Sequence, residues 1–257
     1  MTRHPTVEVT TRFTGVLAGE WVKLSTVRST RWAPVVLVLV TVGVAFLGGI
    51  TESIQRGETI LGSTANGSVL GMLVAGLLGA MAMSNEYGTG TIRATFGACP
   101  RRLPVLGAKV AVVATLVFVV ALLACAGALL TGLAVLSGKG YATGDPLPAL
   151  LGMAACFAAV AVLGLAAAAI LRHAAAAVVA VVGVVLLPSL LGPLFGAWQR
   201  WVVGASPMAA VQKLAQSTDA APDAPGGLGP WQSLGLVGAY TLAALVVAGW
   251  LLRRRDV

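Results

Sequence analysis

The chain has 257 residues, of which 58% are hydrophobic and only 10% charged, and its formal net charge is +8. So apolar and so weakly charged a composition excludes an ordinary water-soluble domain. The basic residues flank apolar blocks and form no patch interleaved with aromatic side chains, so we expect anionic lipid headgroups, and not nucleic acid, to be what they meet.

The segment before the first apolar block contains a candidate amphipathic helix. Apolar residues recur there at spacings of three and four, and basic residues fall away from that stripe. The stripe consists of Phe13, Val16, Leu17, Trp21, Leu24 and Val27, and the basic residues are Arg12, Lys23 and Arg28. We expect this helix to lie in the headgroup plane and to lead into the first span. The alternative interpretation is a cluster of charges that only anchors the span.

Six apolar blocks follow, each close to the roughly 20 residues that a helix needs to cross the hydrocarbon layer. They are 32–50, 61–83, 110–136, 148–171, 174–195 and 233–252, and none contains Asp, Glu, Lys, Arg or His. Backbone groups in lipid need internal partners, and the short alternating segments of a barrel are absent. We therefore expect an all-α integral membrane protein with six transmembrane helices, forming a single domain over residues 1–257.

The connection after the second block is unusually polar, and reads Asn85-Glu-Tyr-Gly-Thr-Gly-Thr-Ile-Arg-Ala-Thr-Phe-Gly-Ala-Cys-Pro-Arg-Arg102. Ser84 or Asn85 is suited to cap a helix start, and Glu86 would then lie in the first turn, where an anion is favoured. Pro100 would end this helix, and Lys109 would snorkel from the start of the third span. We expect a short helix across the cytoplasmic face whose exposed side chains contact a partner. An ordinary basic loop is the alternative, but it leaves the carboxylate and the Gly-Thr-Gly-Thr run unexplained.

Several features of the spans themselves allow predictions. Gly71, Ala75 and Gly79 form a stripe of small residues on the second span, which favours close helix packing. Pro188 and Pro193 are expected to kink the fifth span. Residues 207–215 are expected to form a short outer helix in the long connection before the sixth span.

Lysines and arginines divide unevenly between the two sides of the predicted membrane. If the spans alternate, thirteen lie on the side that carries both termini, and four lie on the other side. The richer side is expected to be cytoplasmic. We therefore expect a multi-pass protein of the plasma membrane with both termini in the cytoplasm.

The motifs of common enzymes are absent from the sequence. There is no Walker A sequence, no Gly-x-Ser-x-Gly elbow and no His-Glu-x-x-His pair, so we expect no catalytic residues, no bound cofactor and no metal site. The histidines are His4 and His173 alone. Cys99, Cys125 and Cys156 lack metal-ligand spacing and are interpreted as small apolar residues.

Two short motifs resemble the ABC-2 type transporter permeases of actinobacteria. The motifs are Gly19-Glu20-Trp21-Val22-Lys23-Leu24 with Arg28-Ser29-Thr30-Arg31-Trp32 before the first span, and Asn85-Glu86-Tyr87 with Thr91-Ile92-Arg93-Ala94-Thr95 after the second. Together with six spans and cytoplasmic termini, the resemblance covers nearly the whole chain.

This resemblance implies an exporter of a drug, antibiotic, lipid or polysaccharide. Two permease subunits, identical or homologous, would pair in the lipid bilayer with two ABC ATPase subunits, which would use the ATP and Mg. An elbow helix would include Glu20, Trp21, Lys23, Leu24, Arg28 and Arg31. A coupling helix from Glu86 to Phe96 would contact the ATPase through Glu86, Tyr87, Gly88, Thr89, Gly90, Thr91, Ile92, Arg93, Thr95 and Phe96. Glu86→Ala would then lower ATP-driven transport without affecting membrane insertion.

Three other functions remain open at this point. A membrane scaffold or immunity protein of similar shape would need no ATPase. A secondary carrier is less consistent with the sequence, because ion-coupled carriers keep ionisable groups inside their spans. An intramembrane enzyme would need a nucleophile–base pair that the sequence does not offer.

Overall fold

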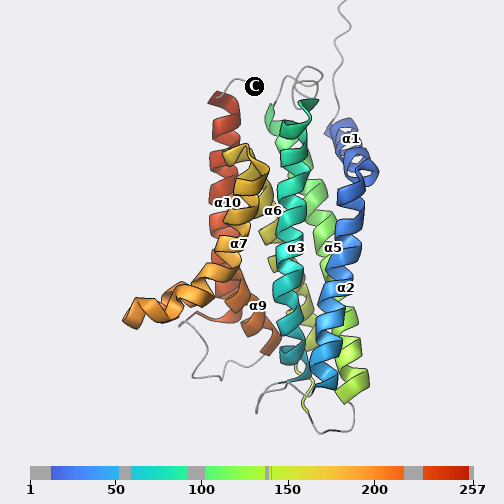
Figure 1. The fold of residues 1–257 in the computed structure, drawn as a ribbon, viewed down its shortest axis with the longest axis vertical. Coiled ribbons are helices and arrows are strands. Elements are labelled where there is room, and N and C mark those ends of the chain that lie inside the picture. Colours follow the sequence, from blue (N-terminus) through green and yellow to red (C-terminus); the bar gives the residue numbers. More distant parts are fainter. Residues whose placement is uncertain are drawn as a thin grey trace, which may run out of the picture.

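The structure is a computed structural model that describes residues 13–51, 59–91, 102–136, 139, 141–216 and 228–254. Within these ranges every regular element is a helix. In chain order the elements are α1 (Phe13–Thr26), α2 (Arg28–Ile50), α3 (Ile60–Gly88), α5 (Arg102–Leu136), α6 (Pro146–Leu171), α7 (Ala174–Leu191), the 3-10 helix η1 (Gly192–Trp198), α8 (Gln199–Gly204), α9 (Pro207–Gln216) and α10 (Pro230–Arg254). The long helices lie side by side in an elongated bundle (Figure 1).

Six helices in the described part of the chain are long and apolar enough to cross a membrane: α2, α3, α5, α6, α7 and α10. They correspond to the six predicted blocks, so the prediction of an all-helical chain with six candidate spans is confirmed. The bounds differ most around the second connection, where α3 continues to Gly88 and α5 already begins at Arg102. Both helices thus include residues that the sequence assigned to a loop.

The bundle is built around α3 and α6. Their most apolar stretches have 67% and 61% of their residues buried, whereas the other four candidate spans have between 17% and 28%. Since α3 packs on α2, α5, α6, α7 and α9, it is in contact with most of the molecule. A displacement of α3 would therefore change the packing of most of the other spans.

Glycines allow α3 and α6 to approach closely, as the stripe of small residues predicts. A Cβ atom on Gly79 would collide with the carbonyl oxygen of Ala161, and one on Gly164 would collide with that of Gly76. Gly71 leaves room for the ring of Phe157, which is fully buried. Because backbone meets backbone at this crossing, larger residues have no space there.

One end of the bundle carries α1, the start of α2, the C-terminal ends of α3, α6 and α10, and the start of α5 (Figure 1). This end is called the α1 end below. The N-terminal ends of α3 and α6 lie at the opposite end, and η1, α8 and α9 lie toward it (Figure 1).

The predicted helix at residues 207–215 is confirmed as α9. Most of its residues are buried, and it packs against α6, α10 and α3. Lys213 on α9 is 5% exposed, and its Nζ donates to the carbonyl oxygen of Leu228 and the hydroxyl of Ser233. Burial lowers the pKa of Lys213. This connection therefore folds back into the bundle, which its Pro- and Gly-rich continuation gave no reason to expect.

The structure also places the cysteines and the two prolines of the fifth span. Cys125 and Cys156 are buried free thiols, which agrees with their interpretation as small apolar residues, and Cys99 lies outside the described residues. Pro188 lies inside α7, whereas Pro193 lies at the start of η1. The fifth span therefore ends at Leu191 by changing to a 3-10 helix, and not at the predicted residue 195.

Candidate functional site

Four charged side chains meet at the α1 end, and we call them the charge ring: Glu20, Lys23, Glu86 and Lys109. Lys23 Nζ lies 2.7 Å from Glu20 Oε1 and 2.9 Å from Glu86 Oε1. Lys109 Nζ lies 2.5 Å from Glu20 Oε2 and 2.8 Å from Glu86 Oε1. Each cation thus contacts both anions, and the ring has no net charge. It joins α1, the end of α3 and the start of α5.

Lys109 is the most completely satisfied member of the charge ring. Besides the two carboxylates, its Nζ donates to the carbonyl oxygen of Ala82 at 3.3 Å, so all three ammonium hydrogens have acceptors. Its side chain is only 4% exposed. The prediction that Lys109 snorkels to the surface is therefore wrong. α5 begins about two turns before Lys109, so this residue lies within the helix and not at its start. Its side chain projects inward, where the two carboxylates hold it.

Lys23 is the exposed member of the charge ring, with 40% of its side chain accessible. Burial alone would lower the pKa of Lys23. Its hydrogen bonds to Glu20 and Glu86 together outweigh that effect, so the pKa lies above its usual value. Lys23 therefore keeps its positive charge at neutral pH.

Glu86 does not lie in the first turn of a new helix, which corrects that prediction. α3 continues to Gly88, so Glu86 belongs to the last turn of α3. A carboxylate is disfavoured at a helix C-terminus, where the helix dipole is negative. Lys23 and Lys109 offset this effect, and Glu86 is buried between them at 7% exposure. Its carboxylate is therefore not available to a partner molecule.

The end of α3 is formed by glycine and threonine. The backbone N–H of Thr89 donates to the carbonyl oxygen of Asn85, and Gly90 has φ = +71°, a conformation that favours glycine at a helix end. Gly88, Thr89, Gly90 and Thr91 are all exposed. The other predicted coupling residues, Ile92, Arg93, Thr95 and Phe96, lie outside the described residues. The exposed part of the predicted contact surface thus begins at Gly88.

The predicted elbow is divided between two helices. Glu20, Trp21, Lys23 and Leu24 lie on α1, which ends at Thr26, whereas Arg28 and Arg31 lie in the first turns of α2. The buried residues of α1 are Glu20 and Leu24, while Phe13, Trp21 and Val27 of the predicted apolar stripe are exposed. The charge ring explains the difference, because it turns Glu20 inward and leaves part of the apolar stripe on the outside.

A second contact ties the end of α3 to the turn between α6 and α7. The guanidinium of Arg172 lies over the ring of Tyr87, 5.7 Å from its centre. Arg172 has φ = +53°, which is unusual for a residue other than glycine, and it is the C-cap of α6. Next to it, His173 caps α7 by accepting a hydrogen bond from the N–H of Ala176. The end of α3 is thus connected to four other helices.

A hollow of about 470 Å³ lies beside the charge ring. Lys23, Glu86 and Lys109 line it, together with side chains of α1, α2 and α3. Thr89 and Thr91 bring their exposed side chains to it from the end of α3. The hollow combines threonine hydroxyls with apolar walls, which suits the binding of a side chain better than a reaction.

The four side chains of the charge ring join three helices through ion pairs. Among the residues that the structure describes, no three or more His, Cys, Asp or Glu side chains come together as metal ligands would. Comparisons with models of known protein families and with curated proteins find no match for this chain. The geometry of the α1 end therefore carries the inference about function.

Sequence reasoning identified Glu20, Lys23 and Glu86 but did not connect them, and it missed the roles of Lys109 and Arg172. One signal was present. A lysine and a glutamate at the edges of two apolar blocks are expected to find partners, because unpaired charges are expensive near a membrane. Which residues become partners depends on how the helices pack, and the sequence alone does not predict that packing.

Proposed function

We propose that this chain is the membrane-spanning permease subunit of an ATP-binding-cassette exporter. A separate ATPase subunit, present in two copies, would bind and hydrolyse ATP with Mg, and a second permease copy or homologue would complete the transporter. The substrate, of the drug, antibiotic or lipid type, would leave the cell through the paired spans. The observation that carries the proposal is the connection of the exposed end of α3 to four other helices.

Such a connection is what a transport subunit without a motor requires. Work done by a partner at the exposed residues Gly88 to Thr91 would reach α1 and α5 through the charge ring, and α6 and α7 through Arg172. Since α3 packs on most of the other spans, a small displacement at its end would be carried into the bundle. The segment from Gly88 to Phe96 would be the coupling segment in contact with the ATPase, and Glu86 would tie it to the charge ring.

In this proposal α1 is the elbow helix at the membrane surface. Phe13 and Trp21 are half exposed, which is appropriate for side chains that enter the headgroup region. Glu20 and Leu24 would hold the helix against α5. The α1 end would face the cytoplasm of a plasma membrane, since the predicted cytoplasmic excess of lysine and arginine belongs to this end.

Co-purification tests the proposal. The tagged chain, solubilised from the membranes of its host in mild detergent, is expected to bring an ATP-hydrolysing subunit with it. Gly88→Arg is expected to abolish that association, because it places a large cation on the exposed end of α3, where a new side chain meets no neighbour. Thr51→Arg is the matched control and should retain the subunit. Thr51 is exposed and follows the last residue of α2, at the end of the bundle opposite the α1 end.

The competing functions predict different results. A scaffold or immunity protein would purify without an ATPase, and its properties would not change with Gly88→Arg. A secondary carrier would transport its substrate after ATP depletion and would stop when an uncoupler removes the ion gradient. Either result contradicts the proposed function. Gly88→Arg is a sharper test than Glu86→Ala, since the latter also removes a buried charge from the charge ring.

A further inference from the structure

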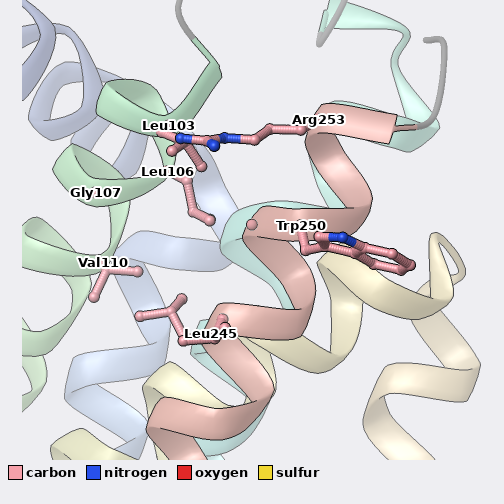
Figure 2. A pocket seen from close by; sticks show the side chains of 9 residues that line it. Leu103, Leu106, Gly107, Val110, Leu245, Trp250 and Arg253 are labelled. Carbon is pink, nitrogen blue, oxygen red and sulfur yellow. The ribbon is translucent and has the colours of Figure 1, made fainter.

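A second hollow lies on the outer surface of the bundle, between α5 and α10, and is called the α5–α10 groove. Its volume is about 490 Å³. Leu103, Leu106 and Val110 line it from α5, and Leu245 lines it from α10 (Figure 2). From Leu245 to Arg253 the groove follows α10 for roughly 12 Å, given the rise of a helix per residue. Its walls are therefore apolar along most of its length.

The groove owes its depth to two glycines. Gly249 on α10 allows Leu103 to approach, since a Cβ there would lie 3.3 Å from a methyl carbon of Leu103. Gly107 on α5 is exposed, and a Cβ there would meet nothing within 4 Å. The open space at Gly107 is therefore not filled by the protein itself.

Positive charge is concentrated at one end of the groove. Arg253 lines it and extends from α10 toward Leu103 and Leu106 (Figure 2). Arg254 lies over the ring of Trp250, 4.4 Å from its centre, and Trp250 also lines the groove. Both arginines are exposed at the α1 end of α10, and no acidic residue lines the groove among those that the structure describes. The site thus has an apolar slot with cations at its mouth.

We propose that the α5–α10 groove binds an anionic phospholipid. An acyl chain would occupy the slot along Gly107, and the headgroup phosphate would accept hydrogen bonds from Arg253 at the mouth, with Arg254 adding a second positive charge. The order of groups matches a lipid standing in the bilayer, because α10 is long and apolar enough to cross a membrane and its arginines lie at its end. The bound lipid would cover α5 close to Lys109 of the charge ring.

A second copy of this chain is a poorer occupant. A symmetric contact centred on the groove would bring the same surface of both copies together. It would thus bring Arg253 and Arg254 of one copy near their equivalents on the other, and none of the described residues that line the groove is a carboxylate that could separate them. An anionic lipid meets the same charges with attraction.

The first experiment measures lipid retention by native mass spectrometry of the full chain. Phosphatidylglycerol and phosphatidylcholine with identical acyl chains are added in turn to the delipidated protein. We expect phosphatidylglycerol to be retained about tenfold more tightly, because both headgroups carry the phosphate but only phosphatidylcholine also carries a cation, which Arg253 and Arg254 repel. Glycerol 3-phosphate, which carries the phosphate without acyl chains, should not compete at the same concentration.

Two matched pairs of variants locate the site. Arg253→Gln should weaken phosphatidylglycerol retention about tenfold. Arg31→Gln should not, although it removes the same charge from the same end of the protein. Gly107→Leu should fill the slot and weaken both lipids, whereas Gly235→Leu, at an equally open and exposed glycine of α10, should change neither. Unchanged thermal unfolding of Arg253→Gln shows that lost retention is not lost folding.

Four results would overturn the proposal. Equal retention of the two lipids would remove the role of the net negative charge of the headgroup, and competition by glycerol 3-phosphate would assign the site to a free phosphate compound. Equal effects within either matched pair would show a general effect of charge or of surface area. If the protein is a dimer and Gly107→Leu makes it a monomer without changing lipid retention, the groove would be assigned to a second copy.

Discussion

Lys109 illustrates how a single residue can be decisive at the edge of a membrane. An ammonium group that is 4% exposed is tolerated only because Glu20, Glu86 and a backbone carbonyl accept all of its hydrogens. Lys23 contacts the same two carboxylates but is 40% exposed, so water shares in its solvation. Two lysines with the same partners therefore contribute very differently to stability.

Replacing each lysine by alanine tests this difference. Lys109→Ala should lower the free energy of unfolding by about 3 kcal/mol, because it leaves buried carboxylates short of a partner. Lys23→Ala should cost about 1 kcal/mol or less, as for a pair that water and salt screen. Unfolding of both variants in one detergent measures the two values. Equal losses would contradict the burial that distinguishes the two residues.

The charge ring also predicts that losses are not additive. Glu86→Leu or Lys109→Leu alone leaves an imbalance of charge, but the double variant leaves Glu20 paired with Lys23 at 2.7 Å. The double variant should therefore recover most of the stability that either single variant loses, with a coupling of about 2 kcal/mol. A double-mutant cycle of unfolding free energies provides the measurement. A simple sum of the two losses would show that Glu86 and Lys109 act independently.

At the residue scale, the sequence allowed the important glutamates to be noticed but not to be paired. Glu86 was singled out because a carboxylate between apolar blocks is unusual. Glu86 lies in the last turn of α3 because the helix ends only after it, next to Gly90, whose φ is positive. The assignment of Glu86 to an exposed surface failed for this reason, while the neighbouring Gly88 to Thr91 are exposed as expected.

Among the elements, the crossing of α3 and α6 determines how tightly the bundle is packed. The sequence predicted close packing of the second span, since Gly71, Ala75 and Gly79 recur at one helical face, but it did not predict that α6 would be the partner. The burial of α9 could not be predicted in the same way. Its pattern indicates a helix but not which surface the helix covers.

One substitution made on two helices tests the crossing. Gly79→Ala should destabilise the protein by about 1–3 kcal/mol, because the new methyl group collides with the carbonyl oxygen of Ala161. Gly43→Ala on α2 meets no neighbour within 4 Å, and should leave stability unchanged or raise it by up to about 1 kcal/mol. Thermal unfolding in detergent gives both values. The same sign for both variants would contradict the close approach of α3 and α6.

For the whole molecule, the number of spans follows from composition, because about 20 apolar residues in a row have few alternatives to a membrane helix. The orientation is a separate prediction and rests on lysine and arginine alone. Thr89 and Thr51 are exposed and suit a test, because they are the C-caps of α3 and α2, two helices that end at opposite ends of the bundle. In a background without Cys99, Cys125 and Cys156, a membrane-impermeant maleimide should label Thr51→Cys in intact cells. It should label Thr89→Cys only after permeabilisation, and the reverse pattern would invert the topology.

The central claim is that the end of α3 receives work from an ATPase, and cross-linking in the host membrane tests it most directly. A photoreactive amino acid at Thr89 would sample the surroundings of this end, and the same residue at Thr51 would sample the opposite end as a control. The account predicts that Thr89, and not Thr51, becomes cross-linked to an ATP-hydrolysing subunit, with a yield that changes when ATP is depleted. Cross-links from Thr89 to lipid and to other copies of the chain, with no such subunit among the products, would contradict it.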